Sequence, residues 1–213
     1  RKKLVENDAD PAENVCVATG YGRVSVPYAD KMITEITCHA MGAVWIFDNK
    51  DMTIIDIGGQ DTKIICVEQG FVKDFMMNDK CSAGTGRFLE IMANTLSMRP
   101  NEMCELAREG SGVTISSMCT VFAESEVINY IGEGKKREDI AAGVVDSVAA
   151  KVAQLSQRKT LSDKVILTGG LSDSVYFTDI LSKKLGCVVE TTKNGRYAGA
   201  LGAALLAKEK KKR

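Results

Sequence analysis

The segment IIDIGGQDTKII, residues 54–65, places a Gly-Gly pair between two runs that are rich in isoleucine. Apolar and polar residues alternate on both sides of the glycines, which predicts two antiparallel strands joined by a tight turn. The alternation continues past a second turn at Gln69–Gly70, so residues 52–78 are expected to form consecutive antiparallel strands. Strand and helix patterns alternate towards the end of the chain, and this order favours an α/β fold with a mixed sheet.

The tip of this hairpin also carries groups that can bind a phosphate, a metal ion or water. Gly58 and Gly59 have no side chain, so the backbone N–H groups there can approach a phosphate closely. Asp56 at the strand end can hold Mg²⁺ through water, and Gln60 and Asp61 are the nearest groups for orienting water or the metal. An ordinary hairpin with a glycine turn has the same pattern, so the motif alone leaves both interpretations open.

Two later segments give weaker signals. In VILTGGLSDS, residues 165–174, a β-branched strand leads into Gly169–Gly170 and a helix start, where a nucleotide base or ribose can lie over the backbone. Many α/β proteins contain such a connection without binding a nucleotide. In AGALGAALLA, residues 198–207, small residues recur at four-residue spacing, and we interpret them as a close helix-packing surface. Further helices are expected near residues 31–42, 101–108, 120–131 and 140–155, with a β-like run at 112–119.

Charge and cysteine content restrict the class of protein. Lys and Arg number 28, as do Asp and Glu, so the formal net charge is zero. Neither nucleic acid nor an anionic membrane is therefore expected as a partner. No apolar run approaches the ~20 residues of a membrane span. Seven scattered cysteines are typical of a reducing compartment rather than a disulfide framework, so a cytoplasmic location is expected.

Two of the cysteines differ from the others in context. Cys81 lies in MNDKCSAGTGRFLEIMA and Cys119 in ISSMCTVFAESEVI, each shortly before an expected helix. They can be core thiols, nucleophiles or ligands; the single histidine, His39, is far away in sequence, which disfavours a nucleophile, and we expect it to be structural. The remaining cysteines are interpreted as core residues, namely Cys16, Cys38, Cys66, Cys104 and Cys187.

The glycine and cysteine motifs together resemble one family. ATGYGR, CHAMGA, DIGGQDTK, the two cysteine segments, TGG and GALGAAL are similar to activators of 2-hydroxyacyl-CoA dehydratases and to the related ATPase subunits of benzoyl-CoA reductase. The resemblance extends over nearly the whole chain and implies an actin-like ATPase (ribonuclease H-like) fold, with a mixed sheet flanked by helices. It further implies that Gly58 and Gly59 hold the phosphates of ATP or ADP with Mg²⁺, and that Gly169 and Gly170 hold the adenosine.

The same resemblance implies that Cys81 and Cys119 bind a 4Fe-4S cluster. Such a cluster needs four thiolates, so two chains around a two-fold axis are expected to share one cluster in a homodimer. The implied function is ATP-dependent one-electron transfer. A ferredoxin or flavodoxin is the expected donor, and an acyl-CoA dehydratase or reductase component is the expected acceptor.

The family also carries an earlier glycine hairpin, of the form Asp-x-Gly-Ser-Thr, and no such stretch precedes Asp56. About 50 residues, too few for an independent core, are expected to be absent, which leaves the first lobe incomplete. Residues 1–50 are then a remnant of that lobe, with helix 197–213 packing back on it, and residues 51–196 form the second lobe. Two alternatives stay open: a small-molecule kinase of the same superfamily, and a cluster-binding dimer module without ATPase activity.

Overall fold

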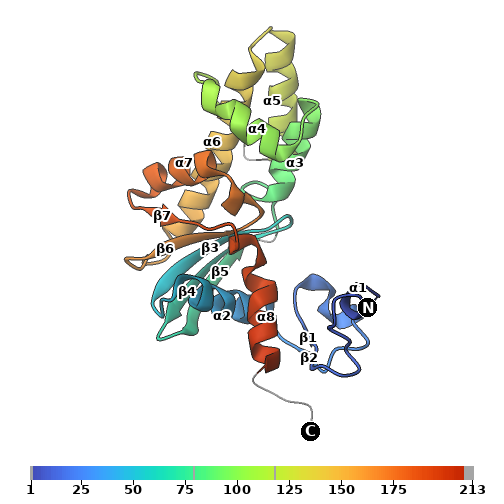
Figure 1. The fold of residues 1–213 in the computed structure, drawn as a ribbon. Coiled ribbons are helices and arrows are strands. Elements are labelled where there is room, and N and C mark those ends of the chain that lie inside the picture. Colours follow the sequence, from blue (N-terminus) through green and yellow to red (C-terminus); the bar gives the residue numbers. More distant parts are fainter. Residues whose placement is uncertain (1, 79, 118, 209–213) are drawn as a thin grey trace.

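The computed structural model describes residues 2–78, 80–117 and 119–208. A five-stranded sheet lies at its centre, with the strand order β5-β4-β3-β6-β7 (Figure 1). The strands are β3 (Met52–Ile57), β4 (Thr62–Glu68), β5 (Phe71–Asn78), β6 (Val165–Gly169) and β7 (Val189–Glu190). The expected antiparallel strands over residues 52–78 are present, and the parallel pairs β3–β6 and β6–β7 make the sheet mixed.

The central strand β3 positions both glycine motifs. It runs antiparallel to β4, from Met52 opposite Val67 to Ile57 opposite Thr62. It runs parallel to β6, with Ile57 opposite Gly169. All residues of β3 are buried, as expected for a strand whose two faces are covered. This pairing brings the tip of the first hairpin and the second Gly-Gly turn to the same edge of the sheet.

Helices cover both faces of the sheet (Figure 1). On one face lie α6 (Arg137–Ser156) and α7 (Val175–Leu185), and on the other lies α2 (Glu35–Phe47) with α8 (Ala198–Lys208) packed beside it. Beyond the first face, α3 (Gly86–Thr95), α4 (Pro100–Leu106) and α5 (Thr120–Gly132) form a helical cap. The connections between these elements contain short 3-10 helices, which are η1 (Tyr21–Ser25), η2 (Ala107–Glu109), η3 (Gly170–Asp173) and η4 (Gly195–Tyr197).

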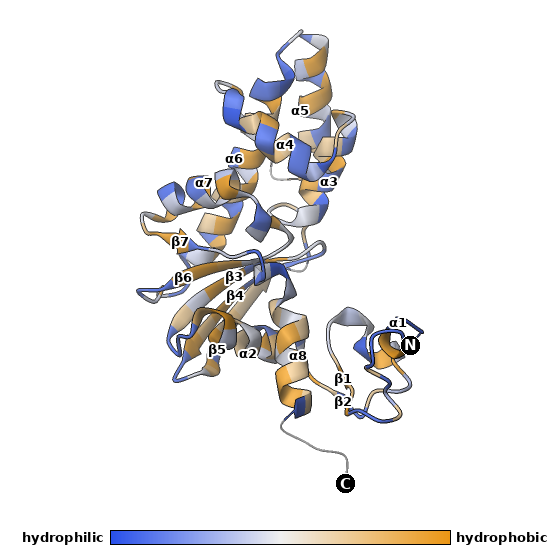
Figure 2. Cartoon of the chain, viewed as in Figure 1, coloured by the Kyte–Doolittle hydropathy of each residue, from blue (hydrophilic) through white to orange (hydrophobic). Residues whose placement is uncertain are grey.

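Alternating strand residues build a separate core on each face of the sheet. Ile55 of β3 and Leu167 of β6 belong to the larger core, which the helices α3 to α7 complete. Ile54 and Ile166 point the other way and pack with Ala43 of α2. In Figure 2 the strands at the centre of the sheet are accordingly coloured as hydrophobic. The adjacent isoleucines Ile54 and Ile55 thus serve opposite cores, because successive side chains of a strand point to opposite faces of the sheet.

The helices α2 and α8 cross with their backbones in contact. A Cβ atom added to Gly42 would lie 1.9 Å from the carbonyl oxygen of Ala198. One added to Gly202 would lie 1.7 Å from that of Cys38. The small residues over 198–207 thus serve close helix packing, as the sequence indicated. The expected helix 197–213 is described as α8 up to Lys208, and residues 209–213 lie outside the described residues.

Residues before α2 form a small segment beside α8 (Figure 1). It contains α1 (Lys2–Val5) and a two-stranded parallel sheet of β1 (Val17–Ala18) and β2 (Lys31–Met32). A groove of about 850 Å³ lies between this segment and α8 and is lined mainly by aliphatic residues and alanines. None of the helices in the described part of the chain is long and apolar enough to cross a membrane.

The helix expected over residues 31–42 begins and ends later than predicted. The residues 31–32 pair with β1 instead, and α2 starts at Glu35. The start is fixed by Thr34, whose side chain accepts a hydrogen bond from the backbone N–H of Thr37. The apolar run through Phe47 then extends the helix beyond Gly42.

Two further expectations are wrong in part. The β-like run at 112–119 forms no strand among its described residues, because no strand lies beside it and its polar groups bond to α5. Of the cysteines assigned to the core, Cys38 and Cys104 are buried. The other three are only half-buried, since they lie next to the short strands β1 and β7 or opposite the edge strand β5: Cys16, Cys187 and Cys66.

Candidate functional site

The hairpin between β3 and β4 ends in a turn that is fixed from two sides. The Gly58 N–H donates to the carbonyl oxygen of Asp61 at 2.9 Å and closes the turn. The carbonyls of Gly58 and Gly59 accept hydrogen bonds at 2.9 Å from the N–H groups of Gly86 and Arg87 at the start of α3. Gly59 and the following Gln60 are exposed. The N–H groups of these two exposed residues are therefore the ones placed to meet a phosphate.

Asp56, at the end of β3, is 2% exposed and lies among polar side chains. Its Oδ1 atom is 3.2 Å from Nε2 of His39 and accepts a hydrogen bond from Oγ1 of Thr168 at 3.3 Å. Its Oδ2 atom is 3.6 Å from Nζ of Lys63. Burial raises the pKa of Asp56, but His39, Lys63 and Thr168 outweigh it, so the pKa lies below its usual value. The carboxylate is ionised at neutral pH.

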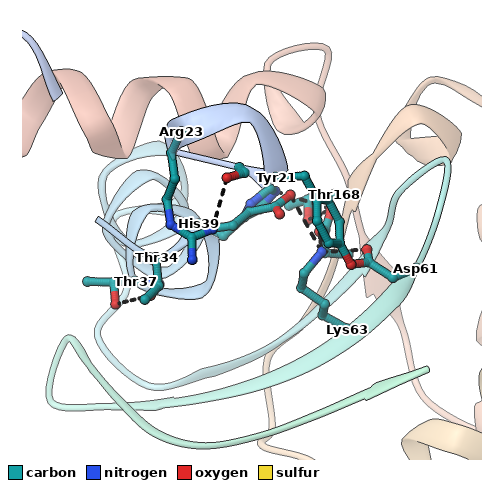
Figure 3. A network of polar contacts seen from close by, with 11 residues as sticks. Tyr21, Arg23, Thr34, Thr37, His39, Asp61, Lys63 and Thr168 are labelled. Atoms are coloured by element: carbon teal, nitrogen blue, oxygen red, sulfur yellow. Dashed lines mark hydrogen bonds and ion pairs between the residues drawn. The ribbon is translucent and has the colours of Figure 1, made fainter. Parts of the chain in front are cut away.

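Lys63 joins this carboxylate to a second one (Figure 3). Its buried ammonium donates to Oδ1 of Asp61 at 2.5 Å and lies 3.5 Å from Oε1 of Glu35. Burial lowers the pKa of Lys63, but the hydrogen bond to Asp61 and the charges of Asp56 and Glu35 outweigh this effect. The pKa of Lys63 is therefore above its usual value. The Tyr21 hydroxyl donates to Oδ2 of Asp61 at 2.7 Å. The N-terminal segment is thereby linked directly to the hairpin.

The charges of this network limit its capacity to bind a metal ion directly. Ligand atoms of Glu35, His39 and Asp56 lie within 4.8 Å of one another, which is close enough for one metal ion. The ammonium of Lys63, however, lies 3.5 Å from Glu35 and 3.6 Å from Asp56. The lysine thus acts as the counter-ion of this cluster. Carboxylate oxygens such as those of Asp56 and Asp61 are the donors that suit Mg²⁺ held through water. Asp56 Oδ2 is buried and accepts no hydrogen bond in the described part of the structure, whereas both oxygens of Asp61 already accept one, from Lys63 and Tyr21.

Gly169 requires the absence of a side chain. Its φ angle is +83°, and an added Cβ atom would lie 2.3 Å from the carbonyl oxygen of Ile57 and 2.8 Å from Oδ1 of Asp56. Gly170 has nothing within 4 Å of the same position. The second Gly-Gly turn therefore packs against the end of β3 and contacts the environment of the Asp56 carboxylate.

The cysteine loops lie together at the start of α5. Cys119 is the N-cap residue of α5, and Cys81 lies in the turn that precedes α3; both are exposed free thiols. The side chains of Ser82 and Thr120 share a hydrogen bond of 2.5 Å, so the two loops are in contact. Two exposed thiols close together, one of them at a helix N-terminus, fit an anionic thiolate-ligated group such as a 4Fe-4S cluster. One chain supplies two such thiols, which is half of the set that this group needs.

Comparison with known proteins decides the family. The model of the BadF/BadG/BcrA/BcrD ATPase family matches residues 2–207. The chain belongs to this family. Within it, the (R)-2-hydroxyglutaryl-CoA dehydratase activating ATPase of Acidaminococcus fermentans is 48% identical over 196 residues, which cover 91% of this chain and 75% of the relative. The activator of lactoyl-CoA dehydratase of Anaerotignum propionicum is 47% identical over 195 residues and covers the same shares.

Solved structures of the family agree with the fold. The crystal structure of the Acidaminococcus fermentans (R)-2-hydroxyglutaryl-CoA dehydratase component A matches with a TM-score of 0.90 at 45% identity, covering 97% of this chain and 80% of that one. The activator of the 2-hydroxyisocaproyl-CoA dehydratase from Clostridium difficile, solved with bound ADPNP, matches with a TM-score of 0.91 at 39% identity, covering 98% and 78%. The expected actin-like ATPase fold is therefore confirmed.

Sequence reasoning located the motifs of this family member but missed the groups that connect them. It identified the hairpin with Asp56, the Gly169–Gly170 turn and the cysteines, and the structure places the first two at one edge of the sheet. It assigned His39 a structural role and did not mention Lys63, although both lie against Asp56. The signal available was DIGGQDTK itself, where alternation points the lysine to the same side as Asp61.

Proposed function

We propose that this chain, as a dimer, couples ATP hydrolysis to the delivery of single electrons to an acyl-CoA dehydratase or a related CoA-ester reductase component. The observation that carries the proposal is the pair of exposed cysteines on contacting loops, in a member of an ATPase family. Relatives in that family are named as activators of such dehydratases. All seven cysteines are free thiols, which suits a reducing cytoplasmic setting.

The nucleotide is assigned to the edge of the sheet where the two glycine motifs meet. The N–H groups of the exposed residues Gly59 and Gln60 bind the phosphates, and the adenosine lies over the Gly169–Gly170 turn, where the space beside Gly170 is open. Asp56 and Asp61 hold Mg²⁺ through its water shell, and the side chain of Gln60 orients the attacking water. The ADPNP bound to the Clostridium difficile activator supports a nucleotide site in this fold.

Cys81 and Cys119 of each protomer would together provide the four thiolates for one 4Fe-4S cluster shared by the dimer. Such a cluster would supply low-potential one-electron chemistry between a ferredoxin or flavodoxin and the dehydratase component. The chain itself connects the two sites, because the N–H groups of Gly86 and Arg87 donate to the hairpin tip, and α3 begins shortly after Cys81. A movement of the hairpin tip on ATP hydrolysis is therefore transmitted to the Cys81 loop through the short stretch of backbone between Cys81 and Gly86.

The test is anaerobic and uses a 2-hydroxyacyl-CoA dehydratase component as acceptor. The reconstituted, reduced chain is mixed with it in the presence of MgATP, of a non-hydrolysable analogue, or of no nucleotide. Of these three conditions, we expect only MgATP to activate the dehydratase component. Activation without nucleotide would contradict it, and ATP turnover that needs a small hydroxylated acceptor and no iron would indicate a kinase. Iron binding without any nucleotide binding by calorimetry would indicate a dimer module that lacks ATPase activity.

A further inference from the structure

The loop that leads into Cys119 is held by side chains from the helix that follows it. Glu126, within α5, accepts hydrogen bonds from the backbone N–H of Ser116 at 2.8 Å and from its hydroxyl at 2.7 Å. The hydroxyl of Ser117 also donates to Glu126. Farther along α5, the Tyr130 hydroxyl donates to the carbonyl oxygen of Thr114 at 3.0 Å. Helix α5 thus reaches back to fasten the segment before its own N-cap cysteine.

Ile115 anchors the loop in the larger core, and Val113 packs against the same core. Ser116 is exposed and Ser117 is half-buried, so these two residues, which lie nearest to Cys119, are held mainly by the hydrogen bonds to Glu126. The loop also has no neighbouring strand in the described structure to satisfy its backbone groups. Partial burial raises the pKa of Glu126, but the hydrogen bonds from Ser117 and Ser116 outweigh it and keep the carboxylate ionised. A charged acceptor makes stronger hydrogen bonds than a neutral one.

The Cys81 loop is fastened in an analogous way by the last residue of β5. The side-chain amide of Asn78 donates to the carbonyl oxygens of Cys81 at 3.0 Å and of Ala83 at 2.9 Å. The Thr85 hydroxyl donates to the carbonyl oxygen of Ser82 at 2.7 Å and closes the turn. The hydrogen bond from Ser82 to Thr120 then joins this loop to the other one.

We propose that Glu126 is a positioning residue that holds the Cys119 loop in its ligand-ready arrangement before any iron binds, with Asn78 doing the same for Cys81. The inference rests on the proposed function, since the thiols are positioned for the shared cluster. Glu126 acts through Ser116 and Ser117 rather than on the sulfur. Outer groups that orient ligands typically change metal retention by 10–100-fold. Preformed loops also spare the ordering entropy that ligand binding would otherwise cost.

The first measurement uses the iron-free chain and does not depend on activity. Hydrogen exchange, read by mass spectrometry, follows the peptide that contains Ser116. Glu126→Ala should speed exchange of that peptide about tenfold, since a hydrogen bond to a carboxylate is lost. Glu126→Gln should lie in between, because the amide keeps one acceptor oxygen for the serine hydroxyls. Glu124→Ala is the matched control, as Glu124 lies on the same helix and accepts from Thr95 of α3 instead.

The second measurement uses the reconstituted chain and follows iron release to a chelator. Glu126→Ala and Asn78→Ala should release iron roughly tenfold faster than the wild type, and Glu124→Ala at the wild-type rate. Unchanged exchange in Glu126→Ala would overturn the inference whatever the iron result. Faster exchange with an unchanged rate of iron release would also overturn it, because Glu126 would then be merely structural. A wild-type chain that takes up no iron would instead refute the proposed function, and with it the role of Glu126 towards the thiols.

Discussion

At the scale of single residues, the two glycines of the second Gly-Gly turn differ in whether they can be replaced by a residue with a side chain. A methyl group on Gly169 would meet Ile57 O and the Asp56 carboxylate, and the φ angle of +83° is unfavourable for any L-residue. We expect Gly169→Ala to destabilise the fold by about 3 kcal/mol and to weaken nucleotide binding. Thermal denaturation and calorimetry with ADP measure both effects. Gly170→Ala is the matched control and should stay close to wild type, since nothing lies within 4 Å of the added atom.

The thiols differ in reactivity for a reason that can also be tested at single residues. Burial raises the pKa of the Cys104 thiol to about 11, although a hydrogen bond with Ser174 opposes the shift. At pH about 8 this thiol is almost wholly protonated and enclosed, and only the thiolate reacts with alkylating reagents. Iodoacetamide should therefore label the exposed Cys81 and Cys119 of the native iron-free chain well before Cys104. Equal labelling of all three by mass spectrometry would contradict the packing described.

The sequence could predict the chemistry of individual residues only where a local pattern carries it. Asp56 follows a buried strand and precedes a glycine turn, so its importance was visible. The contacts of His39 with Asp56 and of Tyr21 with Asp61 join residues that lie far apart in the chain. No local periodicity encodes such a pairing. It depends on how α2 and the N-terminal segment are placed against the hairpin.

At the scale of elements, the crossing of α2 and α8 tolerates no added side-chain atom at its glycines. The backbone of α8 at Gly202 touches α2, so any side chain there separates the two helices. We expect Gly202→Ala to cost about 2–3 kcal/mol, which thermal or urea denaturation detects. Gly132→Ala, at the end of α5, is the control and should be neutral or slightly stabilising, because the space around it is open and alanine favours helix. Similar stability for both variants would contradict the backbone contact.

The elements themselves were predictable to different degrees. Strands β3 to β5 carry a clear alternation and strong turns, and their positions were recognised from the sequence. Residues 112–117 carry β-branched residues, yet they form a loop, because a strand needs a partner and none lies beside them in the described structure. The start of α2 was misplaced because a helix begins at its cap, and Thr34 was not recognised as that cap.

At the scale of the whole molecule, the described chain contains half of what its candidate electron-transfer site needs. The five-stranded sheet brings the two glycine motifs to one edge, and the cap helices present two cysteines on contacting loops. The fold was predictable, because motif order and strand pattern agree across the chain. The second pair of thiolates that we propose is not visible in any single-chain pattern. It follows only from the ligand count of the cluster and the symmetry of a dimer.

The most direct test of the central claim compares iron content and sedimentation of the wild type, Cys119→Ser and Cys104→Ser after anaerobic reconstitution. The wild type should be a dimer with about four iron atoms per two chains. Cys119→Ser should lose all the iron and dimerise more weakly, because symmetry removes two ligands at once and a hydroxyl is a poor substitute. Cys104→Ser should keep the iron at a cost of roughly 1–3 kcal/mol in stability. Full iron in Cys119→Ser, with loss in Cys104→Ser, would contradict the ligand assignment.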